Sequence, residues 1–331
     1  MKGRYIDMGR LRKTLFAAIA LTMAMSTAAY ADDAPKVIYD PSVSGVTDSS
    51  NSGSQSERGF IDEAGLQLIN DAQARQTAAD SMDALMKMNM NMDMDFSDDT
   101  TGQTQNLAIG MNIDMAMKMK NITSPENMQY IIDMNMTMPG LTDEALNMRM
   151  FYANNWLYSD TAGQKTKQYI DPAIYTGVEL SDSMKQILTS STYDTNFFKT
   201  LTVTSHNTDN AEGNTVLAYT MDGNEIMDYV NQLYEAMGMN LSDLGLSMSI
   251  SDVTGEITVN SAGYITRDTL NMNINMGGSS LGLDNMGVTV TADVTYNNPG
   301  APVNFDLPST EGYQEIVGGT DTALDSTLAL Q

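Results

Sequence analysis

The stretch "MKMNMNMDMDF", residues 86–96, alternates a large apolar side chain with a polar one along its whole length. Met occupies every second position up to the final Phe96, and Lys, Asn and Asp stand between. Successive side chains of a β-strand point to opposite faces of a sheet, so this period of two predicts a strand with one apolar and one polar face. Taken alone, the same stretch also suggests a methionine tract that binds a soft metal ion.

The same alternation returns later in the chain. Residues 109–119 and 128–138 repeat it after short polar turns, and residues 264–276 end with it. Strands that follow one another through short turns pair antiparallel, so we predict an antiparallel sheet of about ten strands. The remaining strand signals cover residues 148–152, 164–170, 201–221, 246–260 and 288–298.

Helical spacing marks a smaller part of the chain. Apolar residues recur at three- and four-residue steps over residues 61–86, which predicts a long amphipathic helix that runs into the quoted stretch. Asp222 in an N-cap position and Gly238 after the last apolar position predict a second helix between them. Residues 181–188 and 193–201 resemble two short helices. No compositional linker divides these elements, so we predict one α+β domain.

The start of the chain has the pattern of an export signal. Basic residues precede the apolar run "TLFAAIALTMAM", and "AYA" ends at Ala31. The run is shorter than the ~20 residues that span a bilayer, so a cleaved secretory signal is favoured over a retained anchor, and Met8 is an alternative start. The predicted organisation is a signal peptide at 1–31, a flexible Ser/Asp/Gly-rich leader at 32–58, a folded domain at 59–310 and an irregular tail at 311–331.

Charge and composition narrow the partners. The formal net charge is −25, and the predicted cleavage removes mostly basic residues. A protein with this much negative charge repels nucleic acid and is not attracted to anionic membranes. We therefore expect no nucleic-acid partner and at most transient envelope or membrane contact. The chain has no Cys. Neither a disulfide nor a lipid anchored through Cys can therefore form, and the expected location is secreted or extracytoplasmic.

Catalytic chemistry has little support in the sequence. His206 is the single His, and no nucleophile motif or phosphate-binding loop is present. Four aspartates between Asp93 and Asp99 crowd one strand end, but the spacing of a calcium loop is missing, so we interpret them as a solvated acidic turn. We predict a non-enzymatic protein with no catalytic residue, no metal centre and no cofactor.

The apolar face needs a cover, because burying one Met is worth roughly 1.5–3 kcal/mol. Val and Ile suit strands better, whereas unbranched Met adapts to irregular apolar partners. We therefore interpret the face as a pliable lining that contacts an apolar ligand, with a helix-covered core as the alternative. The predicted ligand-binding residues are Met88, Met90, Met92, Met111, Ile113, Met115, Met134, Met136, Met150, Met272 and Met276.

The order of the elements resembles a known family. The segments "MRMFYANNWLYSDTAGQKTKQYID" (148–171), "DGNEIMDYVNQLYEAMG" (222–238) and "PVNFDLP" (302–308) are similar to the LolA-like superfamily and, within it, to LppX/LprG-type lipid-binding proteins. The resemblance implies a curved antiparallel half-barrel whose concave face, covered by helices, holds acyl chains. Many relatives are anchored through a Cys that this chain lacks.

Three other functions stay open at this stage. Thioethers are soft ligands for Cu(I), and two Met on one strand face, about 6.6 Å apart, could converge on one ion. Oxidation of Met to the sulfoxide would suit a sacrificial antioxidant. A structural or interaction domain of the cell envelope would need no small ligand. The sequence does not specify the oligomeric state.

Overall fold

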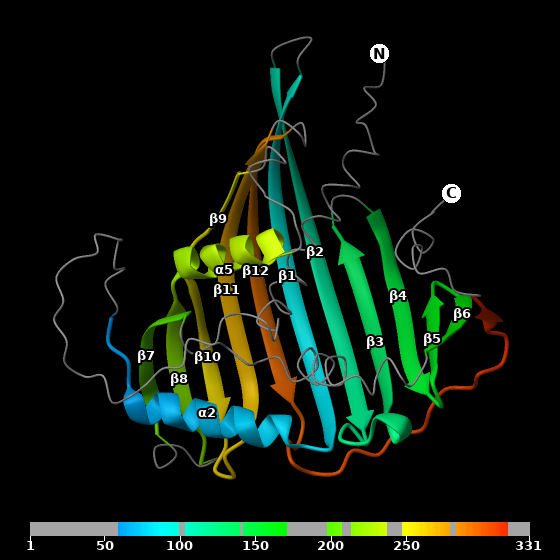
Figure 1. Cartoon of the computed structure of the whole chain (residues 1–331). Coiled ribbons are helices and arrows are strands. Elements are labelled where there is room, and N and C mark those ends of the chain that lie inside the picture. Colours follow the sequence, from blue (N-terminus) through cyan, green and yellow to red (C-terminus); the bar gives the residue numbers. More distant parts are fainter. Residues whose placement is uncertain are drawn as a thin grey trace.

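The computed structural model describes residues 59–98, 103–139, 142–170, 197–206, 213–236, 247–278 and 283–316. In this part of the chain, thirteen strands form one curved, open sheet that is accompanied by two α-helices (Figure 1). The predicted signal peptide, leader and first short helix lie outside the described residues, as does most of the predicted tail.

The elements follow one another in an order dominated by strands. The helices are α2 (Glu63–Thr77), a short 3-10 helix (Pro125–Asn127) and α5 (Gly223–Ala236). The strands are β1 (Ser81–Asp98), β2 (Gln103–Lys120), β3 (Gln129–Met138), β4 (Thr142–Ala153), β5 (Trp156–Thr161), β6 (Gln164–Tyr169), β7 (Phe198–Ser205), β8 (Thr215–Met221), β9 (Ser247–Ile250), β10 (Val253–Val259), β11 (Ile265–Gly278), β12 (Leu283–Tyr296) and β13 (Gln314–Glu315).

The sheet runs in the order β13-β6-β5-β4-β3-β2-β1-β12-β11-β10-β8-β7, with β9 also beside β11. Its named strands pair antiparallel, apart from the parallel pair β13 and β6. The predicted antiparallel sheet is therefore confirmed, but the expected number of about ten strands is too low. Two of the additional strands are β5 and β13, and a third arises because residues 246–260 form two strands, β9 and β10, in place of one.

Tight turns explain why β5 was missed. Asn154 and Asn155 both have positive φ, 53° and 67°, and they join β4 to β5 through a two-residue turn. Two successive left-handed residues produce the turn type whose twist matches a β-hairpin, and Asn tolerates that conformation. Ala162 and Gly163 form a similar two-residue turn between β5 and β6, with φ of 51° and 88°. Three strands therefore follow one another over residues 142–169.

The first predicted helix is shorter than expected. Asp62 accepts a hydrogen bond from the backbone N–H of Gly65 at 2.9 Å and begins α2, which ends at Thr77. Met82 and Met86, which also match the helical spacing, belong to β1 instead. Asp80 lies between the helix and the strand, and its carboxylate accepts hydrogen bonds from the backbone and hydroxyl of Thr123 beyond β2.

A second correction concerns the predicted helix over residues 193–201. From Phe198 onward this segment is strand β7, paired with β8. Phe198 and Leu201 are both buried, so the apolar contacts made by the strand outweigh the local helical spacing. The helix predicted after Asp222 is present as α5, and the Asp222 carboxylate accepts a hydrogen bond from the N–H of Asn224 at 2.8 Å.

Short segments lie against both edges of the sheet. Gly59 and Asp62 donate backbone hydrogen bonds of 2.9 Å to carbonyls of β7, and Leu201 donates one back to Phe60 at 3.0 Å. At the other edge, β13 pairs with β6. Covering an edge satisfies its backbone groups and removes a template for aggregation. The open sheet therefore keeps its edges occupied without closing.

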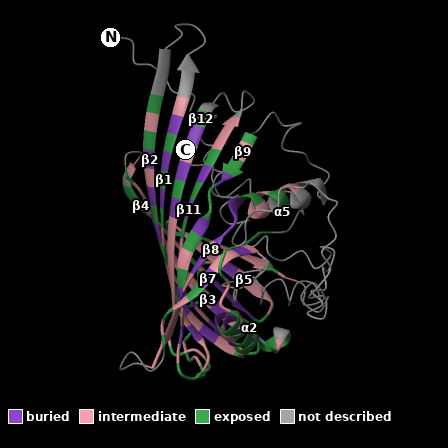
Figure 2. Ribbon diagram, turned by 90° about the vertical axis from the view of Figure 1, so that its left-hand side faces the viewer, coloured by how far each residue is buried: buried purple, intermediate pink, exposed green. Residues whose placement is uncertain are grey.

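The two faces of the sheet differ in chemistry. The methionine face is the one that carries Met88, Met90 and Met92, and the polar face is the opposite one. Ile69 and Ala72 of α2 are fully buried in the same apolar cluster as the methionines of β1 and β2. Figure 2 shows both helices on one side of the sheet. Helix α2 contacts β7, β10 and β11, and α5 contacts β9.

A glycine in β10 tests this packing. A Cβ at Gly255 would collide with the carbonyl oxygen of Thr269 and with the hydroxyl of Tyr219, which donates a hydrogen bond to that carbonyl at 2.9 Å. We expect Gly255→Ala to lower the free energy of unfolding by about 1–3 kcal/mol or more, as overpacking does. Urea unfolding measures the change.

The matched control is Gly287→Ala in β12, where the nearest atom to a new Cβ is Asn275 Oδ1 at 3.8 Å. A strand glycine with space around it loses entropy on folding, so this variant should be neutral or more stable by up to about 0.5–1 kcal/mol. Equal effects of the two substitutions would contradict the described contact.

The pair Arg267 and Asp293 predicts a pH dependence. Arg267 donates hydrogen bonds of 3.0 and 2.8 Å to Asp293, and these hold the pKa of Asp293 below its usual value. A carboxylate with a lowered folded-state pKa stabilises the fold above the ordinary Asp pKa of about 3.9, and the contribution disappears as the pH falls through the lower value. Asp293→Asn should cost about 0.2–1 kcal/mol at pH 7, because the pair is partly exposed.

The two proteins should converge in stability at acid pH. Thermal unfolding at pH 7 and near pH 3 measures the difference between wild type and variant. A difference that grows on acidification would contradict the assignment.

Candidate functional site

The strand register places the predicted ligand-binding residues on one face. Met90 lies opposite Met111, and Met88 lies opposite Ile113. Ile113 in turn lies opposite Met136 on β3. On the other side of β1, the pairing of β12 with β11 brings Met272 into the row of Met90 and Met276 into the row of Met94. Residues that are far apart in sequence therefore share one surface.

Burial divides the predicted residues into two groups. Met90 and Met92 are 1% exposed and Met111 is fully buried, so these three belong to the core. The buried group consists of Met90, Met92, Met111, Ile113, Met136 and Met272. The partly exposed group consists of Met88, Met115, Met134, Met150 and Met276.

Two partly exposed methionines were missed by the sequence prediction. Met86 lies opposite Met115, and Met148 lies opposite Met134, which itself lies opposite Met115. We call Met86, Met115, Met134 and Met148 the methionine row. Met86 could have been included from the alternation that begins the quoted stretch. Met148 could have been included from its alternation with the predicted Met150, but its place beside Met134 depends on the register of β3 and β4.

A second row lies elsewhere on the same face. Met94 lies opposite Met286, which lies opposite Met276, and Met276 lies opposite Met248 on β9. Met286 and Met94 are at most 1% exposed. This second row is therefore partly inside the core, whereas every member of the methionine row is partly exposed.

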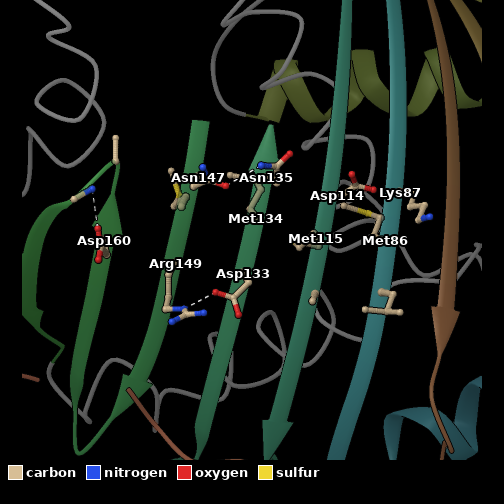
Figure 3. A pocket seen from close by; sticks show the side chains of 15 residues that line it. Met86, Lys87, Asp114, Met115, Asp133, Met134, Asn135, Asn147, Arg149 and Asp160 are labelled. Carbon is tan, nitrogen blue, oxygen red and sulfur yellow. Dashed lines mark hydrogen bonds and ion pairs between the residues drawn. The ribbon is translucent and has the colours of Figure 1, made fainter. Parts of the chain in front are cut away.

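The polar face of the same strands carries a groove of about 750 Å³ (Figure 3). The strands in Figure 3 run in the reverse order to Figure 1 and α5 lies behind them, so the view is from the polar face. The methionine row forms part of the groove lining. Because side chains alternate along a strand, the side chains of the row point to the opposite face, and the row lines the groove with its backbone. The other lining residues are Leu85, Lys87, Asp114, Ala116, Asp133, Asn135, Asn147, Arg149, Asp160, Ala162 and Gly163.

One pair of charges in this groove joins two neighbouring strands. Arg149 of β4 forms an ion pair with Asp133 of β3, and this hydrogen-bonded contact raises the pKa of the guanidinium. Asn135 donates a hydrogen bond to Asn147 at 2.8 Å one row away. The groove therefore combines charged and amide side chains with Leu85 and Ala116, and the side chains of the methionine row lie on the opposite side of the strands.

Other sequence features occupy ordinary structural positions. His206 is exposed after the end of β7, and Asp95 accepts a hydrogen bond from Asn106 at 3.1 Å. The described residues contain no group of three or more His, Cys, Asp or Glu side chains placed to hold a metal ion. Within the same part of the chain, neither α-helix is long and apolar enough to cross a membrane.

Comparisons with known proteins give weak structural likenesses. No family model and no curated protein matches the chain. Among solved structures, LprF from Mycobacterium bovis is similar with a TM-score of 0.38 and 14% identity, over 76% of this chain and 100% of that one. The ywiB protein from Bacillus subtilis has a TM-score of 0.15 and 8% identity, over 64% of this chain and 92% of that one. At such scores neither likeness carries a functional assignment.

The division into core and partly exposed methionines predicts an order of oxidation. Exposed thioethers are converted to sulfoxides before buried ones. With dilute hydrogen peroxide we expect the methionine row to be oxidised before Met90, Met92 and Met111. Peptide mass spectrometry over a time course measures the order. The urea-unfolded chain is the control and should lose the distinction, and equal rates in the folded protein would contradict the described burial.

Proposed function

We propose that the protein is a non-enzymatic, exported binding protein that holds a lipid or another apolar molecule against its methionine face. The observation that supports this is the methionine row. Four neighbouring strands each present a partly exposed thioether at the same level of a face that is otherwise largely apolar and buried.

The free-energy argument starts from the cost of this exposure. Burial of one Met is worth roughly 1.5–3 kcal/mol, so a row of partly exposed methionines retains a substantial driving force for covering it. Ile132, Leu146 and Met150 on the adjoining rows are also partly exposed. An acyl chain laid across β1–β4 would remove all of these side chains from water.

The helices suggest where such a guest would lie. The contacts of α2 and α5 are with β7 and with β9–β11, on the other half of the sheet. We propose that the helices cover this half of the concave face and that the guest covers the half formed by β1–β4. Flexible Met side chains would adjust to acyl chains of different shape.

A fluorescent fatty acid tests the proposal. The decisive variant is Met134→Glu, which puts a carboxylate on the methionine face. Burying a charge beside an apolar guest without a partner is costly, so we expect the affinity to fall at least tenfold. The matched control is Asn135→Glu, the next residue on β3, which changes the polar face by the same side chain and should bind as the wild type does.

Fluorescence titration of the three purified proteins measures the affinities, and circular dichroism checks that each is folded. Equal affinity of wild type and Met134→Glu, or equal loss in both variants, would refute the location of the ligand. Failure of the wild type to bind any of a series of fatty acids would refute the function.

A further inference from the structure

We propose that the methionine row, Met86, Met115, Met134 and Met148, is a binding site for a soft monovalent metal ion, Cu(I) or its analogue Ag(I). The inference rests on the strand register and on the chemistry of thioethers, and it does not depend on the presence of an apolar ligand.

The register places neighbouring residues of the row closer together than neighbours on one face of a single strand. Met86 lies opposite Met115, Met115 opposite Met134, and Met134 opposite Met148. Directly opposed residues have Cβ atoms about 4.5–5.5 Å apart, whereas same-face neighbours along a strand are about 6.6 Å apart. Figure 3 shows Met86, Met115 and Met134 at one level on β1, β2 and β3.

The side chain can close the remaining distance. Met is unbranched and has three rotatable bonds, so the thioethers of neighbouring strands can turn toward a common point. Three of the four residues suffice for one ion, because cuprous sites accept low coordination numbers built from soft sulfur ligands. A thioether is neutral and has no proton to lose, so binding should be independent of pH near neutrality.

The surroundings favour a soft ion over a hard one. The adjoining rows on this face carry apolar side chains, among them Ile113 and Ile132. Mg²⁺ and Ca²⁺ require oxygen ligands, and on β1–β4 the residues of these rows have no side-chain oxygen. The row is partly exposed, so an ion can enter, and the strongly acidic chain attracts cations. The second row is less suited, because Met94 and Met286 are buried.

Leucine separates thioether chemistry from apolar packing. Met and Leu have similar volumes, so their exchange on an apolar face usually costs less than 1.5 kcal/mol. The double variant Met115→Leu and Met134→Leu keeps the apolar surface and removes the two central sulfurs. The matched control is Met248→Leu and Met276→Leu, which removes the two partly exposed sulfurs of the second row.

The experiment titrates each protein with Ag(I), and anaerobically with Cu(I) against a coloured cuprous chelator, and reads the stoichiometry by native mass spectrometry. We expect one ion in the wild type and in the control, and at least a hundredfold weaker binding in the Met115→Leu and Met134→Leu variant. A wild type that yields all metal to the chelator, or a variant that retains wild-type affinity, would overturn the proposal.

The wild type keeps the two proposals apart, because metal binding and fatty-acid binding are separate readouts on the same protein. A wild type that binds Ag(I) but takes up no fatty acid supports the thioether site and refutes the proposed function. Absence of metal binding in the wild type refutes that site and leaves the titration of Met134→Glu unaffected.

Discussion

The pairing of β1 with β2 is the constraint on which the rest of the structure depends. The two strands are in register over their whole lengths, from Ser81 opposite Lys120 to Asp98 opposite Gln103. Because side chains alternate with a period of two, a slip of one residue would move every methionine of one strand to the polar face. The correct register alone joins the methionines of four strands into continuous rows.

The same face uses different residues in different places, and this bears on what Met is for. On β12 the buried positions include Val288 and Val290, which are β-branched and suit a strand that is packed on its apolar side. The neighbouring strand β1 carries Met at the corresponding positions. Met is therefore not required by the sheet itself. Met92 and Met90, which pair with these valines, are themselves buried. Met86 and Met88 on the same strand are partly exposed.

Sequence patterns predicted the antiparallel sheet because alternation is a strong signal on long strands. They failed where a strand was short, or where one stretch matched both the helical and the strand period. Residues 61–86 satisfy helical spacing throughout, but the period of two begins at Met82, and strand pairing decides the boundary. The strand β5 has only six residues, and it depends on the left-handed conformations of Asn154 and Asn155. Such conformations are visible in sequence only as a dipeptide preference.

The face that the candidate site occupies was predictable from the sequence, whereas the exposure of its individual residues was not. A common apolar face followed from the alternation, and the predicted residues do share it. Which of them are core and which are partly exposed depends on tertiary packing, as the contrast between Met90 and Met115 shows. Met148 enters the row through the pairing of β3 with β4, and no local pattern specifies that pairing.

The central claim is that the partly exposed half of the methionine face holds an apolar guest. Native mass spectrometry of the protein purified without detergent, followed by organic extraction, tests it most directly. The account predicts a bound species heavier than the bare chain and acyl compounds in the extract. A bare protein that also fails to take up fluorescent fatty acids would contradict it.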